Sequence, residues 1–148
     1  MAAPFEEITV TAQKREQSIQ DVGISVTAIS GDDLRTLGFT ESVQVVAMTP
    51  GVSRSGSSGE QTAQFSIRGV TQNDFSDHVE APNAVYVDEG YIGFSQAQVF
   101  GLFDLERVEV LKGPQGTLFG RNATGGLVHF ITKKPTRETE GFANVTYG

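Results

Sequence analysis

Alternating apolar and polar positions mark several short strands along the chain. Residues 105–112 alternate in type, with Arg107 and Glu109 on the face predicted to meet water. The stretch 127–133 is apolar on both faces, which is typical of a central strand. The same reasoning predicts further strands at 24–28, 65–68 and 85–87.

Two short helices are expected after the first of these strands. Ser30, with Asp33 three residues later, forms an N-cap pattern, and Gly38 is a typical helix end. Thr40 is expected to cap a second helix that stops before Pro50.

Polar segments separate the strands. Residues 53–62 and 71–83 hold few apolar side chains, and 91–100 carries aromatic residues that look exposed. Small polar residues at this density predict mobile surface loops. The chain therefore alternates between strands and loops, with short helices near its beginning.

A glycine-rich loop joins the strands at 105–112 and 127–133. A short helical turn is expected at 117–119, ended by Gly120. The glycines also invite a phosphate-loop interpretation, but G-x-x-x-x-G-K-[ST] is not met and no long helix follows. A structural turn is therefore favoured, built on Gly113, Gly116, Gly120, Gly125 and Gly126.

The composition limits the classes of function. The 148 residues suit one domain, and a net charge of -7 with a pI of about 4.7 makes nucleic acid a poor partner. Without cysteine there can be no disulfide, thiolate metal site or cysteine nucleophile. No apolar run approaches the ~20 residues of a membrane-spanning helix, so the chain as given is expected to be water-soluble.

The two histidines do not indicate a metal centre by their spacing. His129, within 127–133, is expected to be a buried, hydrogen-bonded imidazole rather than a catalytic one. A solvated acidic loop is favoured over a hard-cation site at His78, which stands beside Asp77 and Glu80. No nucleophile, base and orienting group can be assembled from the motifs, so we predict no enzyme activity, metal or cofactor.

The two ends of the chain differ from its middle. Residues 5–12 place four β-branched side chains in a row with no neighbouring strand in sequence, which predicts an extended, available segment. The polar residues 13–23 are interpreted as a tether. Residues 142–147 alternate again and look like a strand cut off from something larger.

Five motifs in order resemble the plug domain of TonB-dependent outer-membrane transporters. The resemblance covers essentially the whole chain, although His129, Phe130, Gly23 and Glu89 depart from the usual pattern. It implies an α+β fold with a small mixed sheet of about four strands, short helices and long polar loops, inside a barrel of about 22 strands that these residues do not contain. The motifs are EEITVTAQKRE at 6–16, TPGV at 49–52, FSIRGV at 65–70, YVDEG at 86–90 and LERVEVLKGPQGTLFGRNATGGLVHFITKKP at 105–135.

The resemblance also implies a domain organisation and a function. Residues 1–23 would be an N-terminal extension with a TonB box and tether, 24–136 the plug, and 137–148 a linker with the start of the first barrel strand. The plug would gate a transporter for a siderophore or another large substrate in the outer membrane of a Gram-negative bacterium, with its N-terminus in the periplasm. The alternative is a free-standing soluble ligand-binding module with a plug-like fold.

Three sets of site residues follow from the resemblance. The TonB box, which would bind the C-terminal domain of TonB, is Glu7, Ile8, Thr9, Val10, Thr11 and Ala12, with an ordinary edge strand or a disordered terminus as the alternative. Charged residues that would lock the plug to its barrel wall are Arg68, Glu106, Glu109 and Arg121. The alternative is that Arg107, Glu109 and their neighbours pair across the plug's own sheet. Residues that would face an extracellular substrate are Phe75, His78, Tyr91 and Phe94.

Overall fold

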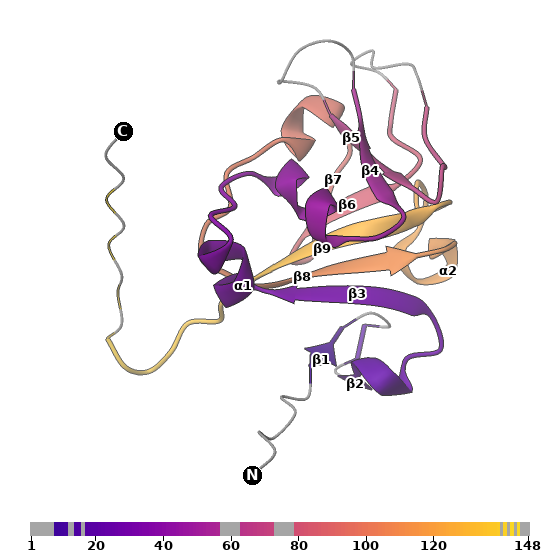
Figure 1. Ribbon diagram of the computed structural model, residues 1–148. Coiled ribbons are helices and arrows are strands. Elements are labelled where there is room, and N and C mark those ends of the chain that lie inside the picture. Colours follow the sequence, from indigo (N-terminus) through magenta and orange to yellow (C-terminus); the bar gives the residue numbers. More distant parts are fainter. Residues whose placement is uncertain are drawn as a thin grey trace.

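A mixed five-stranded sheet forms the centre of the molecule in the computed structural model (Figure 1). The structure describes residues 8–11, 14, 15, 17–56, 63–72, 79–139, 141, 143 and 145. All neighbouring strands are antiparallel except β6 and β9, which are parallel. In spatial order the strands are β3 (Ser25–Ser30), β8 (Leu105–Lys112), β9 (Gly126–Thr132), β6 (Ala84–Val87) and β7 (Gly90–Ile92).

The central pair β8 and β9 confirms the two strands predicted around the glycine-rich loop. Their register runs from Leu105 opposite Thr132 to Lys112 opposite Gly126. Between them, α2 (Gly116–Phe119) is the expected helical turn, and Gly120, with φ +78°, ends it. The loop is therefore a structural turn, as predicted.

The first helix also begins as the sequence predicts. In α1 (Gly31–Thr36), Ser30 accepts a hydrogen bond from the Asp33 amide at 3.0 Å, and Gly38 follows the helix with φ +71°. The second helix, η2 (Ser42–Met48), is a 3₁₀ helix. Its N-cap is Glu41 rather than Thr40, because the helix begins at Ser42, and the Gln44 side chain accepts from the backbone amides of both residues.

Part of the first predicted polar loop is a strand. β4 (Val52–Ser55) pairs with β5 (Gln64–Ile67) in a separate two-stranded sheet. The segment 53–55 has no apolar periodicity, but its backbone pairs with β5, whose four residues are all buried. Residues 57–62 lie outside the described residues.

The third predicted loop begins as a strand as well. β7 pairs with β6 across a two-residue turn at Asp88 and Glu89, so the central sheet has five strands where about four were expected. A short helix, η3 (Ser95–Gln98), follows. The α+β class with a mixed sheet and short helices is confirmed.

Each face of the central sheet carries its own apolar core. Val108 and Val110 face a cluster that includes Phe65 from β5. Leu111, one position along β8, faces the other cluster, which includes Val10 from the N-terminal segment. Because neighbouring residues in a strand point to opposite faces, Glu109 shares the face of Leu111.

The N-terminal residues are paired, contrary to the sequence prediction. β1 (Thr9–Val10) and β2 (Gln17–Ser18) form a small antiparallel hairpin, followed by η1 (Ile19–Asp21), and it lies against the central sheet in Figure 1. The partner of the β-branched run is therefore the stretch predicted to be a tether. The strand expected at 142–147 falls largely outside the described residues, and no helix in the described part is long and apolar enough to cross a membrane.

Candidate functional site

The N-terminal segment 8–11 covers part of the central sheet. Val10 is fully buried in the cluster on that face, whereas Ile8 is 45% exposed. The Ile8 carbonyl accepts a hydrogen bond from the Ile19 amide at 3.0 Å, which closes the hairpin. One side chain of the segment is thus packed against the sheet while its neighbours stay accessible.

A buried carboxylate on β8 holds this segment. Glu109 Oε1 accepts hydrogen bonds from the Thr11 amide at 2.7 Å and the Thr11 hydroxyl at 3.2 Å. The same oxygen accepts from Arg107 Nε at 2.8 Å, and Arg107 also pairs with Glu106. Glu109 has no exposed surface. The structure therefore joins two predicted sites, because Thr11 of the predicted TonB box binds Glu109, which was predicted to face the barrel wall.

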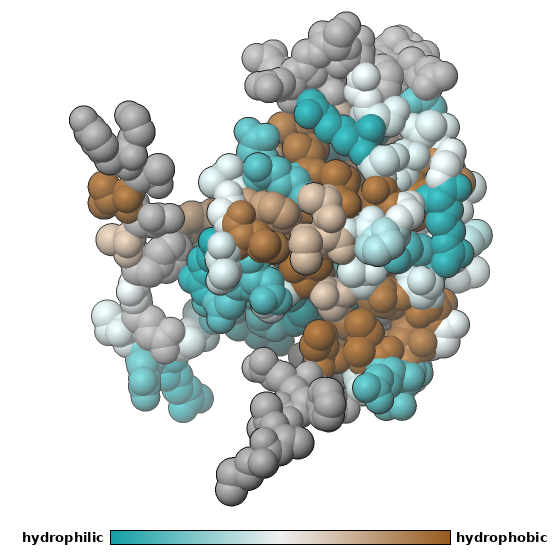
Figure 2. Space-filling view, viewed as in Figure 1, coloured by the Kyte–Doolittle hydropathy of each residue, from teal (hydrophilic) through white to brown (hydrophobic). Residues whose placement is uncertain are grey.

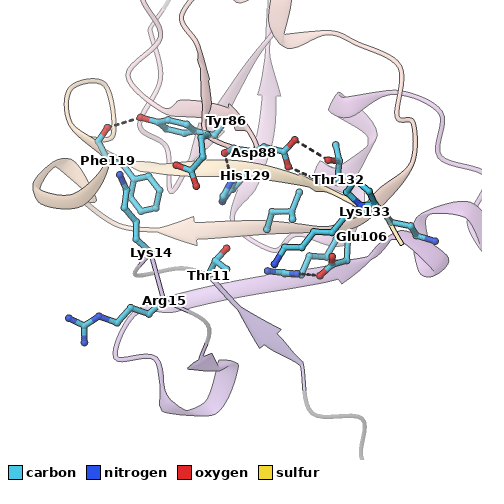
Figure 3. Close-up of a pocket in the computed structure, with 15 residues that line it drawn as sticks. Thr11, Lys14, Arg15, Tyr86, Asp88, Glu106, Phe119, His129, Thr132 and Lys133 are labelled. Atoms are coloured by element: carbon cyan, nitrogen blue, oxygen red, sulfur yellow. Dashed lines mark hydrogen bonds and ion pairs between the residues drawn. The ribbon is translucent and has the colours of Figure 1, made fainter. Parts of the chain in front are cut away.

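A cavity of about 520 Å³ lies beside this contact (Figure 3). Thr11 and Arg107 line it together with Tyr86, Phe119 and His129. The Tyr86 hydroxyl donates to the Phe119 carbonyl at 2.7 Å, and the two rings meet edge to face. Both aromatic and charged side chains therefore line the cavity, and Lys14 Nζ lies 5.5 Å from the centre of the Phe119 ring.

His129 is buried and hydrogen-bonded, as predicted. Its Nε2 lies 2.6 Å from the Asp88 carbonyl oxygen, and Nδ1 has no partner among the described residues. His129 stands directly opposite Glu109 in the register of β8 and β9. The part of the chain that the structure describes contains no cluster of residues that could hold a metal ion.

Tyr91, predicted to face substrate, belongs to a polar cluster. Asn122 donates to the Tyr91 hydroxyl at 2.8 Å and to Glu80, and Arg121 pairs with Glu80 at 3.0 Å. The Tyr91 ring packs against Tyr86 at 5.5 Å between centroids. Burial raises the pKa of the Tyr91 phenol, and the nearby Glu80 carboxylate raises it further, although the Asn122 hydrogen bond lowers it. The hydroxyl therefore stays protonated at neutral pH.

The remaining predicted residues fall into two groups. Arg68 is exposed on a tight turn with φ +52°, and Phe94 is 63% exposed. Glu106 is exposed beside Arg107. The other group lies outside the described residues and consists of Glu7, Ala12, Phe75 and His78.

Sequence reasoning missed the parts played by Arg107, Tyr86 and Phe119. Arg107 was assigned to a water-facing side, yet its side chain is mostly buried and pairs with the fully buried Glu109. The available signal was the charged pair at alternate positions of an otherwise apolar strand, which needs a polar partner when that face is covered. Nothing near β8 in sequence indicates that the partner comes from Thr11.

Comparison with known proteins identifies the fold. The family model of the TonB-dependent receptor plug domain matches residues 18–127. The chain belongs to the TonB-dependent receptor plug family. It is accordingly a plug domain and not an enzyme.

Curated relatives of the plug are outer-membrane receptors. The plug is 32% identical over 136 residues to the pesticin receptor of Yersinia pestis, an alignment that covers 91% of the plug and 20% of the receptor. It is 26% identical over 144 residues to a vitamin B12 transporter of Vibrio vulnificus, which covers 97% and 23%. The chain therefore spans about a fifth of the length of the curated relatives it matches.

Solved structures of receptors contain the same fold. The ferric yersiniabactin uptake receptor of Yersinia pestis matches with a TM-score of 0.66 and 32% identity, over 76% of the plug and 17% of that chain. The ferripyoverdine receptor of Pseudomonas aeruginosa matches with a TM-score of 0.70 and 22% identity, over 88% and 17%, which supports the fold.

Proposed function

We propose that this plug is the gate of a TonB-dependent outer-membrane transporter. It occludes its own barrel, helps to bind substrate through its apical loops, and couples to TonB through residues 7–12. The observation that best supports this proposal is that β1 pairs with β2 and lies on the central sheet without joining it. Withdrawal of residues 8–11 therefore breaks no strand pair of the central sheet.

The proposed partner of this segment is the C-terminal domain of TonB. An extended, β-branched segment can add as a strand to a partner's sheet, with backbone hydrogen bonds giving affinity. Ile8 and Thr9 are exposed in the docked hairpin and offer a first point of contact. Val10 and Thr11 become available once the segment leaves the sheet.

Substitution of Ile8 by proline tests the TonB box. Proline removes a backbone donor, so Ile8→Pro is expected to weaken binding of the TonB C-terminal domain at least about tenfold, as measured by titration calorimetry with the 148-residue chain. Arg137→Pro, at an exposed position near the other end, is the control and should bind like the parent. Equal affinities for Ile8→Pro and the parent would refute the assignment.

The barrel of the same transporter is the second proposed partner. Arg68 forms no ion pair within the described part of the chain, and its backbone adopts a positive φ in a turn. A strained, exposed arginine is a reasonable candidate for bidentate contact with carboxylates on the wall. Glu106 and Arg121 are candidates too, since both are exposed although each forms an ion pair within the plug, whereas Glu109 is fully buried in this conformation.

Apolar surface is consistent with enclosure by another structure. Figure 2 shows brown patches among the polar side chains on the face in view. Phe103 is 75% exposed and borders a cavity of about 550 Å³ between α1 and the start of β8. Exposed apolar side chains of this size mark contact surfaces when they gather in patches. We assign this end of the plug to the barrel wall.

The proposed cargo is a siderophore or another large nutrient, taken up across the outer membrane of a Gram-negative bacterium. Relatives named for vitamin B12 and ferric yersiniabactin support this class. The N-terminus would lie in the periplasm, where TonB can reach it. The loops within residues 53–64, 71–82 and 91–98 would face the extracellular side.

Phe94 is the described candidate for substrate contact with the most exposed ring. Phe94→Ala in the intact transporter is expected to weaken substrate affinity about three- to tenfold, because a stacked ring is lost. Unfolding of the variant should match the parent. Leu118→Ala, at another exposed apolar position, is the control and should leave affinity unchanged. Unaltered affinity in Phe94→Ala would remove Phe94 from the substrate site.

A further inference from the structure

We propose that Glu109 is the latch that sets how often residues 8–11 leave the sheet, and that Arg107 positions its carboxylate. The proposal adds a regulatory residue to the proposed function, on which it rests for the role of the segment. Glu109 was expected to face a barrel wall, and the structure instead turns it toward the N-terminal segment.

The contacts of residues 8–11 single out Glu109. Within the described residues, their backbone-to-backbone hydrogen bonds go to the N-terminal unit itself, through β2, Lys14 and Ile19. The polar contacts that reach the central sheet are the two that Thr11 donates to Glu109 Oε1. Val10 adds the apolar contact. In the part of the chain that the structure describes, Glu109 Oε1 is therefore the single acceptor of the hydrogen bonds that hold residues 8–11 on the central sheet.

The charge of Glu109 makes these hydrogen bonds strong, and Arg107 fixes their geometry. Hydrogen bonds to an ionised acceptor are roughly twice as strong as neutral ones. Arg107 lies two positions along the same strand face, and its Nε donates to the oxygen that Thr11 also uses. The guanidinium is tied in turn to Glu106, which limits its rotation. Arg107 therefore aims Oε1 at Thr11.

The same site is built to open. All three donors converge on Oε1, whereas Oε2 has no partner among the described residues. When the segment leaves, Glu109 keeps Arg107, and water can replace Thr11 through the cavity that Thr11 and Arg107 both line. The carboxylate is then solvated instead of being left buried without partners, which would be far more costly.

A spin label at position 8 measures the latch directly. The chain has no cysteine, so Ile8→Cys gives a single attachment site for a nitroxide at a half-exposed position. In Glu109→Gln the acceptor is neutral, and the ratio of mobile to immobile label is expected to rise about tenfold. The control is Glu138→Gln, the same change at an exposed residue outside β8 and the N-terminal segment, and its spectrum should match the parent. Equal spectra for Glu109→Gln and the parent would overturn the latch.

A double-mutant cycle separates latching from general destabilisation. Thr11→Val removes the hydroxyl donor, and its effect should shrink in the Glu109→Gln background, because the two residues contact each other. Additive effects on the mobile fraction would contradict the proposal. If Glu109→Gln unfolds the sheet, the Thr11→Val variant alone tests the proposal. A spin-label spectrum of Thr11→Val that matches the parent would then count against the latch. Amide exchange at Val108 and Phe130 reports whether the sheet is intact.

The role of Arg107 needs its own comparison. Arg107→Met removes the positioning group and should free the label nearly as much as Glu109→Gln does, while Arg107→Lys keeps a donor and should retain most of the docked population. Identical spectra for the two variants would remove Arg107 from the proposal.

The latch and the TonB assignment can fail separately. A partner that binds only the undocked segment has an apparent Kd that is inversely proportional to the undocked fraction. When that fraction rises, the apparent Kd falls by the same factor. Glu109→Gln should therefore bind the TonB C-terminal domain about tenfold more tightly. Label release without tighter binding would leave the latch standing and refute TonB as the partner of the segment.

Discussion

Gly126→Ala is expected to unfold the domain or to lower its free energy of unfolding by at least about 3 kcal/mol. Gly126 begins β9 with φ +148°, a conformation that residues with a Cβ rarely adopt. A Cβ there would lie 2.2 Å from the Leu111 carbonyl oxygen of the neighbouring strand, and 3.1 Å from the Ile67 side chain. A backbone atom in a paired strand cannot move aside, so both strands at the centre of the sheet would be displaced.

The control for this prediction comes from the same loop. Gly116 has open space where its Cβ would stand and does not have a positive φ, so Gly116→Ala should change stability by less than about 1 kcal/mol. Urea unfolding of the 148-residue chain, followed by circular dichroism, measures both variants. Similar urea midpoints for Gly126→Ala and Gly116→Ala would show that position 126 tolerates a Cβ after all.

The strands with strong apolar patterns were predictable from the sequence alone. β8 and β9 bury residues on both faces, and the glycines between them restrict where the chain can turn. The cap of α1 was equally accessible, because Ser30 and Asp33 interact within one helical turn. Local signals of this kind do not depend on the rest of the fold.

The short polar strands were not predictable in the same way. Residues 53–55 and β7 have little apolar periodicity, and they are strands because a neighbouring strand offers its free backbone edge. Such pairing is decided by tertiary context. The sequence therefore gave no reason to prefer five strands over four in the central sheet.

The candidate site shows the same limit more sharply. Glu109 alternates with valines as a water-facing residue would, but a segment 98 positions earlier in the chain covers that face. The TonB-box residues and the lock residues were predicted separately from motifs. Their contact, between Thr11 and Glu109, is a product of folding that neither motif contains. Long-range docking of this kind is what the structure adds to the sequence.

Phe130→Ala is expected to cost about 3 to 5 kcal/mol of unfolding free energy. Phe130 is fully buried at the centre of β9, and its ring meets Phe100 at 4.9 Å and Phe65 at 6.4 Å between centroids. Phe100 follows η3 and Phe65 belongs to β5. The cavity left by alanine would therefore loosen the packing of η3 and β5 against the central sheet. A loss of this size is a large part of the stability of a domain of this length.

Phe94→Ala is the matched control, because the same ring is removed from a position that is 63% exposed. Its unfolding free energy should stay within about 0.5 kcal/mol of the parent. Amide hydrogen exchange supplies the second measurement. Phe130→Ala should raise the exchange rates of β5 and β6 together, because both strands contribute side chains to the apolar cluster that contains Phe130. Equal stability of the two variants would mean that the sheet does not depend on this core. In that case the plug would be held together mainly by its backbone pairing.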